Sequence, residues 1–392
     1  MYHHNYGSVT VQTIMKRAFD GYERNHKLPF HVRKAAQAIM KCRTAELGGH
    51  MQVCPEGHYH RQWYNSCRHR FCPQCNWIRI EQWLERQKER LLACGHYHMI
   101  FTLPHELNEL WLLNVKAMTN LLFTCIRDTL YEFFLDKKHI GGKPGIIATL
   151  HTWSQTMILH PHIHCLITEG GLAGDRWMST KQKGYLLPVK AVMAVFRGKF
   201  LARMDAAVQR GLIILPDAMT IRQWKNLKNK LGRTKWNVHI RERYDHGQGI
   251  LVYLSRYIRG GAMSNRRIVS FNEKNVAFAY KNSDRSKREK IVLTVTQFIQ
   301  RYLLHVPCPY SKIVRYYGLY APTAEDELNC CRNLFGQEAV SEPNVIDWQN
   351  YCEKKTYDHP ERCPVCGSRL IQRMDIPRIP HFTNKEAIQS AA

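Results

Sequence analysis

The chain has 392 residues, of which 44% are hydrophobic and 11% aromatic, so it can bury two or three packed cores and is not a disordered protein. Its 57 Lys and Arg against 32 Asp and Glu leave a formal charge of +25, which indicates a polyanionic partner. No apolar run approaches the roughly 20 residues of a membrane helix, and no secretion signal is recognisable, so we expect a cytoplasmic protein.

The first 50 residues carry helical signals, with one apolar face formed by Val32, Ala35, Ala36, Ile39 and Met40. A second amphipathic helix is predicted after the cysteine-rich segment, from the face formed by Ile80, Leu84, Gln87 and Leu91. Charged residues crowd the other sides of this second helix. Most of that pattern is ordinary amphipathic packing.

Between these two helices lie five potential zinc ligands: Cys54, His58, Cys67, Cys72 and Cys75. Clustered cysteines in a reducing compartment indicate metal binding and not a disulfide framework. The Cys72-x2-Cys75 spacing is that of a zinc knuckle, and four ligands complete a tetrahedral site. The preferred set is Cys54, His58, Cys72 and Cys75, with Cys67 as a substitute ligand or a packed thiol.

Two arginines inside this loop, Arg68 and Arg70, are candidates for contact with DNA phosphates. The alternative is that both are simply solvated. The basic runs from Arg222 to Lys235 and from Arg285 to Lys290 have the same two interpretations. Because such runs recur through most of the chain, we expect a long electrostatic track more than one basic tail.

The middle of the chain alternates strand and helix signals. We expect strands at 96–103, 146–155 and 157–168, helices at 108–135, 189–210 and 250–259, a β-rich stretch to about residue 282, and a helix at 296–305. The glycine-rich segment 141–145 separates the first long helix from the strands. No internal repeat is present.

Histidines alternate along the expected strand 157–168. A period of two sends His160, His162 and His164 to one face and the apolar residues to the other. Imidazoles two residues apart on a strand are close enough to share a divalent cation, although a His-x-His pattern alone is short. Gln155 would join them across a hairpin and supply a hard amide oxygen suited to Mg²⁺ or Mn²⁺, or it is a turn residue. His151 is the second choice.

Two tyrosines, Tyr253 and Tyr257, are separated by one helical turn, and Arg256 and Arg259 beside them are candidate DNA contacts. Aromatic residues at this spacing more often pack a core. Downstream of a histidine strand in a basic chain, they are also candidate nucleophiles toward a phosphodiester that a metal polarises.

A second knuckle, Cys363-x2-Cys366, lies near the C-terminus and predicts a second zinc site. Its partners stay open: Cys352 and His359 are nearest in sequence, and Cys330 and Cys331 are alternatives. The remaining cysteines are expected to be isolated, buried small residues: Cys42, Cys94, Cys125, Cys165 and Cys308.

The order of zinc knot, His-hydrophobic-His strand and Tyr-x3-Tyr helix resembles the two-tyrosine HUH transposases of the insertion sequence 91 family. The segments FTLPHEL, HTWSQ, HPHIHCLIT, YLSRYIRG, SNRRIVSF and YYGLYA carry the likeness, which extends from about residue 30 to residue 370. The resemblance implies an α+β fold, with a helical zinc-binding domain (1–95), a nuclease core with an antiparallel RRM-like sheet (96–262) and a mixed DNA-binding extension (263–392).

The resemblance also implies an activity. His162 and His164, with Gln155, would bind the catalytic Mg²⁺ or Mn²⁺, and Tyr253 and Tyr257 would cleave and rejoin single-stranded DNA through 5′-phosphotyrosine intermediates during rolling-circle transposition. The expected partner is single-stranded DNA at the element ends and at the target, in the bacterial nucleoid. Two rivals are a replication initiator or relaxase with the same chemistry, and a non-catalytic zinc-ribbon DNA-binding regulator.

Overall fold

The computed structural model describes residues 9–75, 77–182, 184–245, 247–258, 261–282, 287–342, 347–354 and 359–379. The chain is mixed α+β with antiparallel sheets, as expected. It divides into two compact units. The first is made of Met1–Gln82, Arg259–Val306 and Val345–Ala392, and the second of Trp83–Ile258 and Pro307–Asn344. Both units therefore combine segments that are far apart in the sequence.

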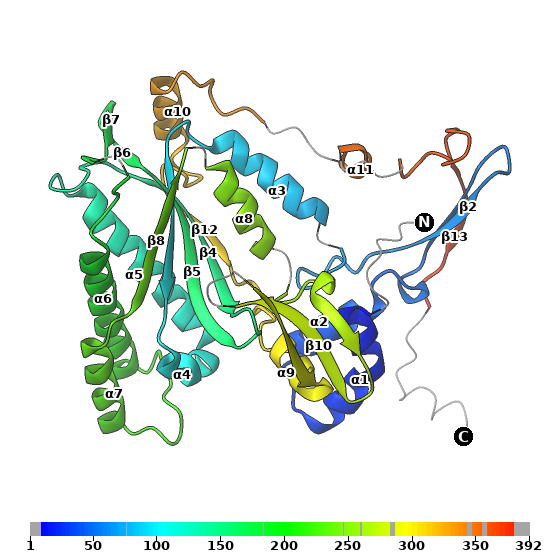
Figure 1. The fold of residues 1–392 in the computed structure, drawn as a ribbon, viewed down its shortest axis with the longest axis horizontal. Helices are drawn as coiled ribbons and strands as arrows, with labels where there is room; N and C mark the ends of the chain where they lie inside the picture. The colour runs from blue at the N-terminus through cyan, green and yellow to red at the C-terminus, as the bar shows by residue number, and fades with distance from the viewer. Residues whose placement is uncertain are drawn as a thin grey trace. The chain divides into compact units, whose positions relative to one another are not determined.

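The second unit is built on a five-stranded antiparallel sheet in the order β12-β4-β5-β3-β8 (Figure 1). Its strands are β3 (His96–Thr102), β4 (Gly145–Trp153), β5 (Leu159–Thr168), β8 (Asn237–Tyr244) and β12 (Val314–Gly318). The helices α5 (Val115–Leu135), α6 (Val189–Gln209) and α7 (Ile221–Arg233) lie on one side of the sheet. The helix α8 (Gln248–Ile258) and the Trp83–Arg90 part of α3 (Trp77–Arg90) lie on the other.

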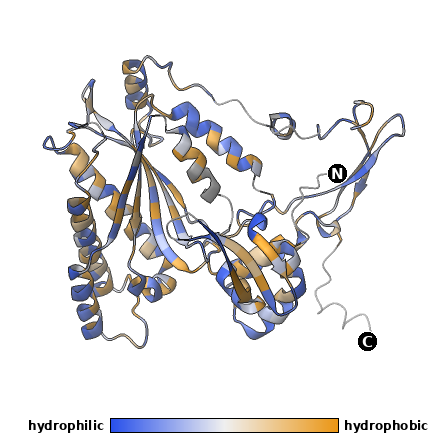
Figure 2. Cartoon of the chain, viewed as in Figure 1, coloured by the Kyte–Doolittle hydropathy of each residue, from blue (hydrophilic) through white to orange (hydrophobic). Residues whose placement is uncertain are grey.

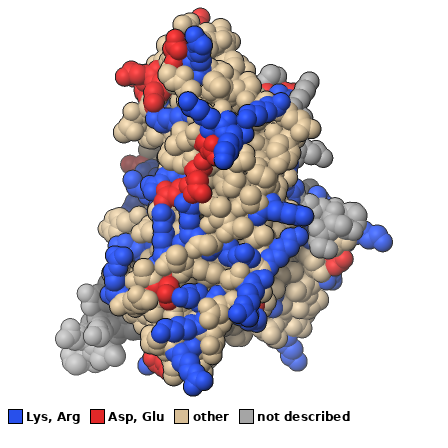
Figure 3. Space-filling view, turned by 90° about the vertical axis from the view of Figure 1, so that its left-hand side faces the viewer, with Lys and Arg blue, Asp and Glu red and all other residues tan. Residues whose placement is uncertain are grey.

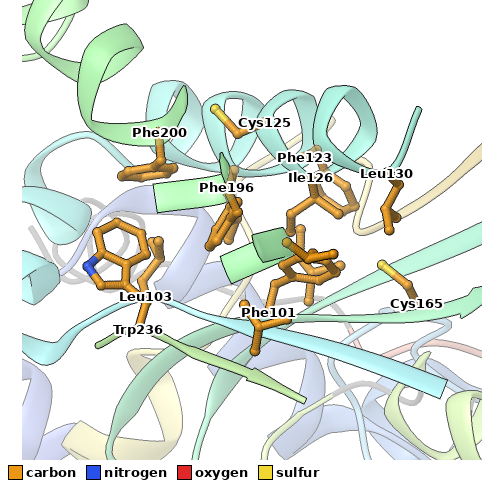
Figure 4. Packing of buried hydrophobic residues seen from close by; sticks show 14 of the residues in the cluster. Phe101, Leu103, Phe123, Cys125, Ile126, Leu130, Cys165, Phe196, Phe200 and Trp236 are labelled. Carbon is orange, nitrogen blue, oxygen red and sulfur yellow. The ribbon is translucent and has the colours of Figure 1, made fainter. Parts of the chain in front are cut away.

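The main core lies between the sheet and α5 and α6. Phe101 of β3 packs edge-on against Phe196 of α6, with ring centroids 5.2 Å apart, and Trp236 packs against the same phenylalanine (Figure 4). Alternation along β5 sends Ile163, Cys165 and Ile167 into this core. Burial of these side chains follows directly from the period of two in the sequence.

The opposite face of the sheet has a smaller apolar cluster of its own. Leu166 of β5 and Ile147 of β4 pack there with Ile250, Leu251 and Leu254 of α8. Because both faces are covered, every residue of β3 is buried and its alternation is masked. Figure 2 shows the resulting contrast between the apolar bands on the sheet strands and the largely hydrophilic α7.

Three further short helices and a hairpin complete the second unit: α4 (Asn108–Leu113), α10 (Glu325–Leu334), the 3-10 turn His105–Leu107, and the pair β6 (Gly170–Ala173) and β7 (Arg176–Ser179). The expected helix 108–135 is interrupted at Asn114, whose side chain donates to the backbone of Leu110 and of Ile214. This side chain therefore ties the interruption to the loop after α6.

The first unit contains the cysteine-rich segments. Helices α1 (Val11–Asn25) and α2 (Phe30–Lys41) pack together, and α9 (Val295–Leu303) packs on α1. A three-stranded sheet of β9 (Ile268–Phe271), β10 (Asn275–Lys281) and β11 (Arg288–Thr294) adjoins α9. A second three-stranded sheet has the order β13-β1-β2, from β1 (Gly49–Val53), β2 (His60–Tyr64) and β13 (Ile371–Ile376). The described part of this unit also contains α11 (Trp348–Lys354) and two 3-10 turns, Ala45–Leu47 and Asn265–Arg267.

Most helices and strands expected from periodicity are present within a few residues of their predicted bounds. The basic run that begins at Arg222 forms α7, which Thr220 starts with a capping box to Gln223. The expected segments 1–95, 96–262 and 263–392 do not coincide with the two compact units, because β12 pairs with β4 and β13 pairs with β1. Within the described residues, no helix is both long and apolar enough to cross a membrane.

Candidate functional site

Three imidazoles converge on the sheet face that carries α8. His162 and His164 alternate along β5, and His151 on β4 lies directly opposite His162. One nitrogen from each of the three lies within 4.8 Å of the others. His151 and His164 are buried and His162 is half-buried, so the cluster is exposed to solvent at His162.

Hydrogen bonds select the nitrogen that two of these rings present. His162 Nδ1 lies 2.6 Å from the backbone oxygen of His160, so Nδ1–H donates and Nε2 carries the lone pair. His164 Nδ1 lies 2.7 Å from His98 Nε2, so His164 Nε2 is available to a cation when His164 Nδ1–H is the donor of this bond. Such bonds to the second ring nitrogen orient the histidines of metal sites.

Burial lowers the pKa of all three imidazoles. Desolvation outweighs the hydrogen bond to His160 and lowers the pKa of His162 to about 4. The pKa values of His151 and His164 lie well below the ordinary 6.5, because burial is reinforced by neighbouring imidazoles. At neutral pH the three rings are therefore uncharged and can coordinate a cation without first losing a proton.

The strand register favours His151 over Gln155 as the third member of this cluster. Gln155 is exposed in the turn after β4, beyond the last paired residues, Trp153 and Leu159. From the sequence, Gln155 was the first choice because its hard amide oxygen would reach His162 across a hairpin, and His151, on the same strand face, was the second. The register reverses this order, since directly opposite side chains are the closest neighbours in an antiparallel pair.

His98 of β3, which hydrogen-bonds to His164, was not among the residues predicted for this site. The sequence signal was a second His-x-His pattern, His96-Tyr97-His98, inside the segment expected to be a strand. In the structure the two histidines of this pattern have different partners, and it is His98 that contacts the cluster. His96 bonds to the Tyr320 hydroxyl at 2.6 Å and to the Cys94 backbone oxygen at 2.9 Å, so it is a buried structural residue.

Helix α8 lies over the sheet face that carries the imidazoles. Its Ile250, Leu251 and Leu254 pack with Leu166 of β5, which follows His164 by two residues and shares its face. The candidate nucleophiles Tyr253 and Tyr257 belong to this helix. Their side chains, that of Arg256, and the whole of Arg259 lie outside the described residues.

The thiols of the N-terminal knot form one four-sulfur cluster: Cys42, Cys67, Cys72 and Cys75. Cys67 and Cys75 sulfurs are 3.6 Å apart, and the backbone N–H of Cys67 points at Cys42 Sγ at 3.5 Å. Neighbouring thiols hold the pKa of Cys75 below its ordinary value. A tetrahedral zinc with bonds of about 2.3 Å separates its sulfur ligands by about 3.8 Å, which these positions match.

Cys54 and His58 belong to a different cluster, with Cys363 and Cys366. The expected set of Cys54, His58, Cys72 and Cys75 is therefore wrong. It failed because proximity in sequence was taken for proximity in space, whereas β1 leads Cys54 away toward β13.

Two further cysteine expectations are corrected by the same clusters. Cys42 was expected to be an isolated packed thiol, but it completes the first cluster from the end of α2. The expected partners of the second knuckle, Cys352 and His359 or Cys330 and Cys331, are not its partners in the structure.

The loop between Cys67 and Cys72 carries the two arginines proposed for DNA contact. Arg68 is exposed, with a positive φ of 52°, and Arg70 is half-buried. Because the cluster ties both ends of this loop, the loop depends on the four thiols for its shape.

The side of the second unit that carries α6 and α7 is also rich in Lys and Arg (Figure 3). Helix α7 contributes five basic residues and no acidic one: Arg222, Lys225, Lys228, Lys230 and Arg233.

Comparisons with known proteins agree with this architecture. A family profile described as "Putative transposase" matches residues 145–327, and one described as "Transposase zinc-binding domain" matches residues 14–103. The chain is similar to "Putative transposase y4qJ" of Sinorhizobium fredii, with 32% identity over 93% of this chain and 95% of that protein. It is also similar to "Transposase for insertion sequence element IS801" of Pseudomonas savastanoi pv. phaseolicola, with 24% identity over 85% and 81%.

No solved structure matches the chain. The first profile covers the histidine strands and α8, and the second covers all four thiols of the first cluster. With the 32% identical relative spanning nearly its whole length, the chain belongs to the IS91 family of transposases and has an N-terminal zinc-binding domain.

Proposed function

We propose that this transposase cleaves and rejoins single-stranded DNA, with Tyr253 and Tyr257 as nucleophiles, during rolling-circle transposition. One observation carries the proposal. Helix α8, which contains both tyrosines, packs on the sheet face where His151, His162 and His164 gather their ring nitrogens within 4.8 Å. A packed core helix would explain the tyrosines alone, but not the convergence of three neutral imidazoles beneath the same helix.

The bond changes balance without an external energy source. A tyrosine hydroxyl loses its proton and attacks the scissile phosphorus, a 5′-phosphotyrosine forms, and the bond to the departing 3′ oxygen breaks and leaves a 3′-hydroxyl. A 3′-hydroxyl then attacks the phosphotyrosine and releases the phenol. With two tyrosines on one helix, two strands can be held covalently at the same time, which permits strand transfer without a double-strand break.

A divalent cation held by the three imidazoles would act as a Lewis acid on the phosphate and help to orient it. The donor set fits such an ion, since the rings are neutral and two of them are oriented by bonds to their other nitrogens. Three nitrogen ligands suit Mn²⁺ better than Mg²⁺, which prefers oxygen. We therefore propose Mn²⁺ as the better cofactor, with Mg²⁺ supporting a lower rate.

The tyrosine role is tested by incubating the protein with Mn²⁺ and labelled single-stranded DNA from the element ends. We expect a covalent adduct on a denaturing gel that Tyr253→Phe together with Tyr257→Phe abolishes. Tyr310→Phe is the matched control, because Tyr310 is fully exposed in the same unit. A protein that forms no adduct under any metal condition would be a non-catalytic DNA-binding regulator, and the proposal would fail.

The histidine role is tested by His162→Ala. We expect cleavage to fall by about 10²- to 10³-fold, the range for loss of one preorganised electrostatic group. DNA affinity should be largely kept, since binding by a +25 chain is mainly electrostatic. Equal loss of cleavage and affinity would instead assign the imidazoles to the fold.

The first thiol cluster is proposed to serve recognition of the element ends, through the loop that carries Arg68 and Arg70. Cys72→Ser should weaken discrimination between end DNA and random DNA more than it lowers cleavage of a short strand. Unchanged end selection in this variant contradicts the assignment. Cys330→Ser, outside both clusters, is the matched control.

A further inference from the structure

Cys54, His58, Cys363 and Cys366 bring together the two ends of the chain. The sulfurs of Cys54 and Cys366 are 3.4 Å apart although 312 positions separate them, and Cys54 Sγ lies 4.0 Å from His58 Nδ1. The four ligand atoms all lie within 4.8 Å of one another. Three sulfurs and one imidazole nitrogen at these distances form the donor set of a structural zinc site.

The backbone on both sides of the cluster is shaped like a pair of metal-binding turns. Each turn begins with Cys-Pro, and the N–H of its first cysteine bonds to a backbone oxygen five residues later, from Cys54 to Tyr59 and from Cys363 to Ser368. Gly57 and Gly367 take positive φ values of 73° and 72° in these turns. The N–H of Val365 points at Cys363 Sγ at 3.4 Å.

Strand pairing places the two turns together. Val53 at the end of β1 pairs with Ile371 at the start of β13, so the residues before Ile371 and those after Val53 emerge at the same end of the sheet. Cys54, Cys363 and Leu370 are buried there against Tyr59. This explains how a knuckle near residue 365 finds its partners near residue 56.

The sheet that joins the turns has almost no core of its own. All residues of β1, β2 and β13 are described, and none of them is buried. Three antiparallel strands without a buried face are not stable in water by themselves. A metal ion bound at the four ligands would supply the missing stabilisation, as it does in small zinc domains.

We propose that Cys54, His58, Cys363 and Cys366 bind a second zinc ion, which fastens the C-terminal segment to the N-terminal zinc-binding domain. The domain is then assembled from both ends of the chain and is complete only when both are present. This inference does not depend on the strand-cleavage chemistry. It assigns the C-terminal knuckle to the zinc-binding domain and not to a separate module.

The zinc content of the full-length protein tests the proposal. We expect two zinc ions per chain, and one in the pair of substitutions Cys363→Ser and Cys366→Ser. Cys54→Ser with His58→Ala should also leave one. Combining all four substitutions should still leave one zinc ion, because both pairs remove the same ion. A chain with all four substitutions that contains no zinc would show that the two pairs belong to separate sites. Cys94→Ser with Cys330→Ser is the control and should keep two.

Cobalt substitution distinguishes the two sites by their ligands. In Cys42→Ser with Cys72→Ser, the remaining Co²⁺ should have the charge-transfer absorption of three thiolates and one imidazole. In Cys363→Ser with Cys366→Ser, it should have the stronger absorption of four thiolates. A wild-type chain with one zinc and a Cys54–Cys366 disulfide, detected as two missing thiols, would overturn the proposal.

Hydrogen exchange tests the fastening directly in folded protein. Cys54→Ser should speed exchange of the peptide that contains β13 by about tenfold or more, although more than 300 residues separate them, because the strand loses its anchor. The peptides of β4 and β5 serve as the internal reference and should not change. Unchanged protection of β13 would also overturn the proposal.

Discussion

The histidine cluster and the cluster of Cys54, His58, Cys363 and Cys366 both have ligands suited to a metal. They differ in how well the sheet that carries each cluster is packed. The imidazoles lie on a five-stranded sheet that is packed on both faces, so that the fold orients them before any ion binds. The thiols lie at the end of a three-stranded sheet with no buried strand residue. Preorganisation suits catalysis, whereas the proposed zinc ion would give the second cluster its order.

Removal of zinc should give the largest difference between the two regions. Binding of a structural zinc ion contributes about 10–16 kcal/mol to the folding free energy of small zinc domains. A strong chelator should therefore abolish protection of β1, β2 and β13 against hydrogen exchange while β3, β4 and β5 keep theirs. Equal loss of protection in both sheets would show that the five-stranded sheet also depends on zinc.

Truncation of buried side chains should give the next largest difference. Phe101→Ala should lower the free energy of unfolding by about 3–5 kcal/mol, because Phe101 is fully buried against Phe196. Met374→Ala on β13 should change it by no more than about 0.5 kcal/mol, since Met374 is 56% exposed. Denaturant titrations monitored in each unit measure both. Similar costs would show a core in the small sheet that burial does not reveal.

Metal binding to the histidine cluster should add a smaller increment of stability. At a Mn²⁺ concentration of 100 times the dissociation constant, the second unit should gain about 2.7 kcal/mol, the mass-action value for a preformed site. The gain should be absent in His162→Ala. A second unit that unfolds without Mn²⁺ would place the imidazoles in the same class as the thiols.

Acidification should give the smallest effect of the series. The pKa of His162 is lowered from 6.5 to about 4, so between these pH values the unfolded chain binds more protons than the folded chain at this residue. Without Mn²⁺, the contribution of His162 to stability should be nearly constant above pH 6.5 and should fall as the pH decreases below it. At pH 5.5 the contribution of His162 is at most about 1.4 kcal/mol. His162→Gln, which does not titrate, should have a correspondingly shallower profile.

Local patterns in the sequence were sufficient for most of the second unit. The alternation of His160, His162 and His164 with apolar neighbours predicted both the strand and the face that carries its imidazoles, because a strand has a period of two whatever it pairs with. Apolar residues spaced three and four apart likewise predicted α5, α6 and α8, because the period of a helix is also a local property of the chain. Strands without alternation or turn signals, such as β12 and β13, were not predicted, because their place is decided by the strands beside them.

The chemistry available was therefore readable from the sequence: imidazoles on one face, thiols in pairs, tyrosines one helical turn apart and a charge of +25. Tertiary structure alone decided which of these groups meet. Cross-strand register placed His151, and not Gln155, opposite His162, and the pairing of β1 with β13 divided the thiols into two clusters. The physical reason is that ligand spacing within a segment is fixed by local backbone geometry, whereas contacts between segments depend on long-range pairing that no local pattern encodes.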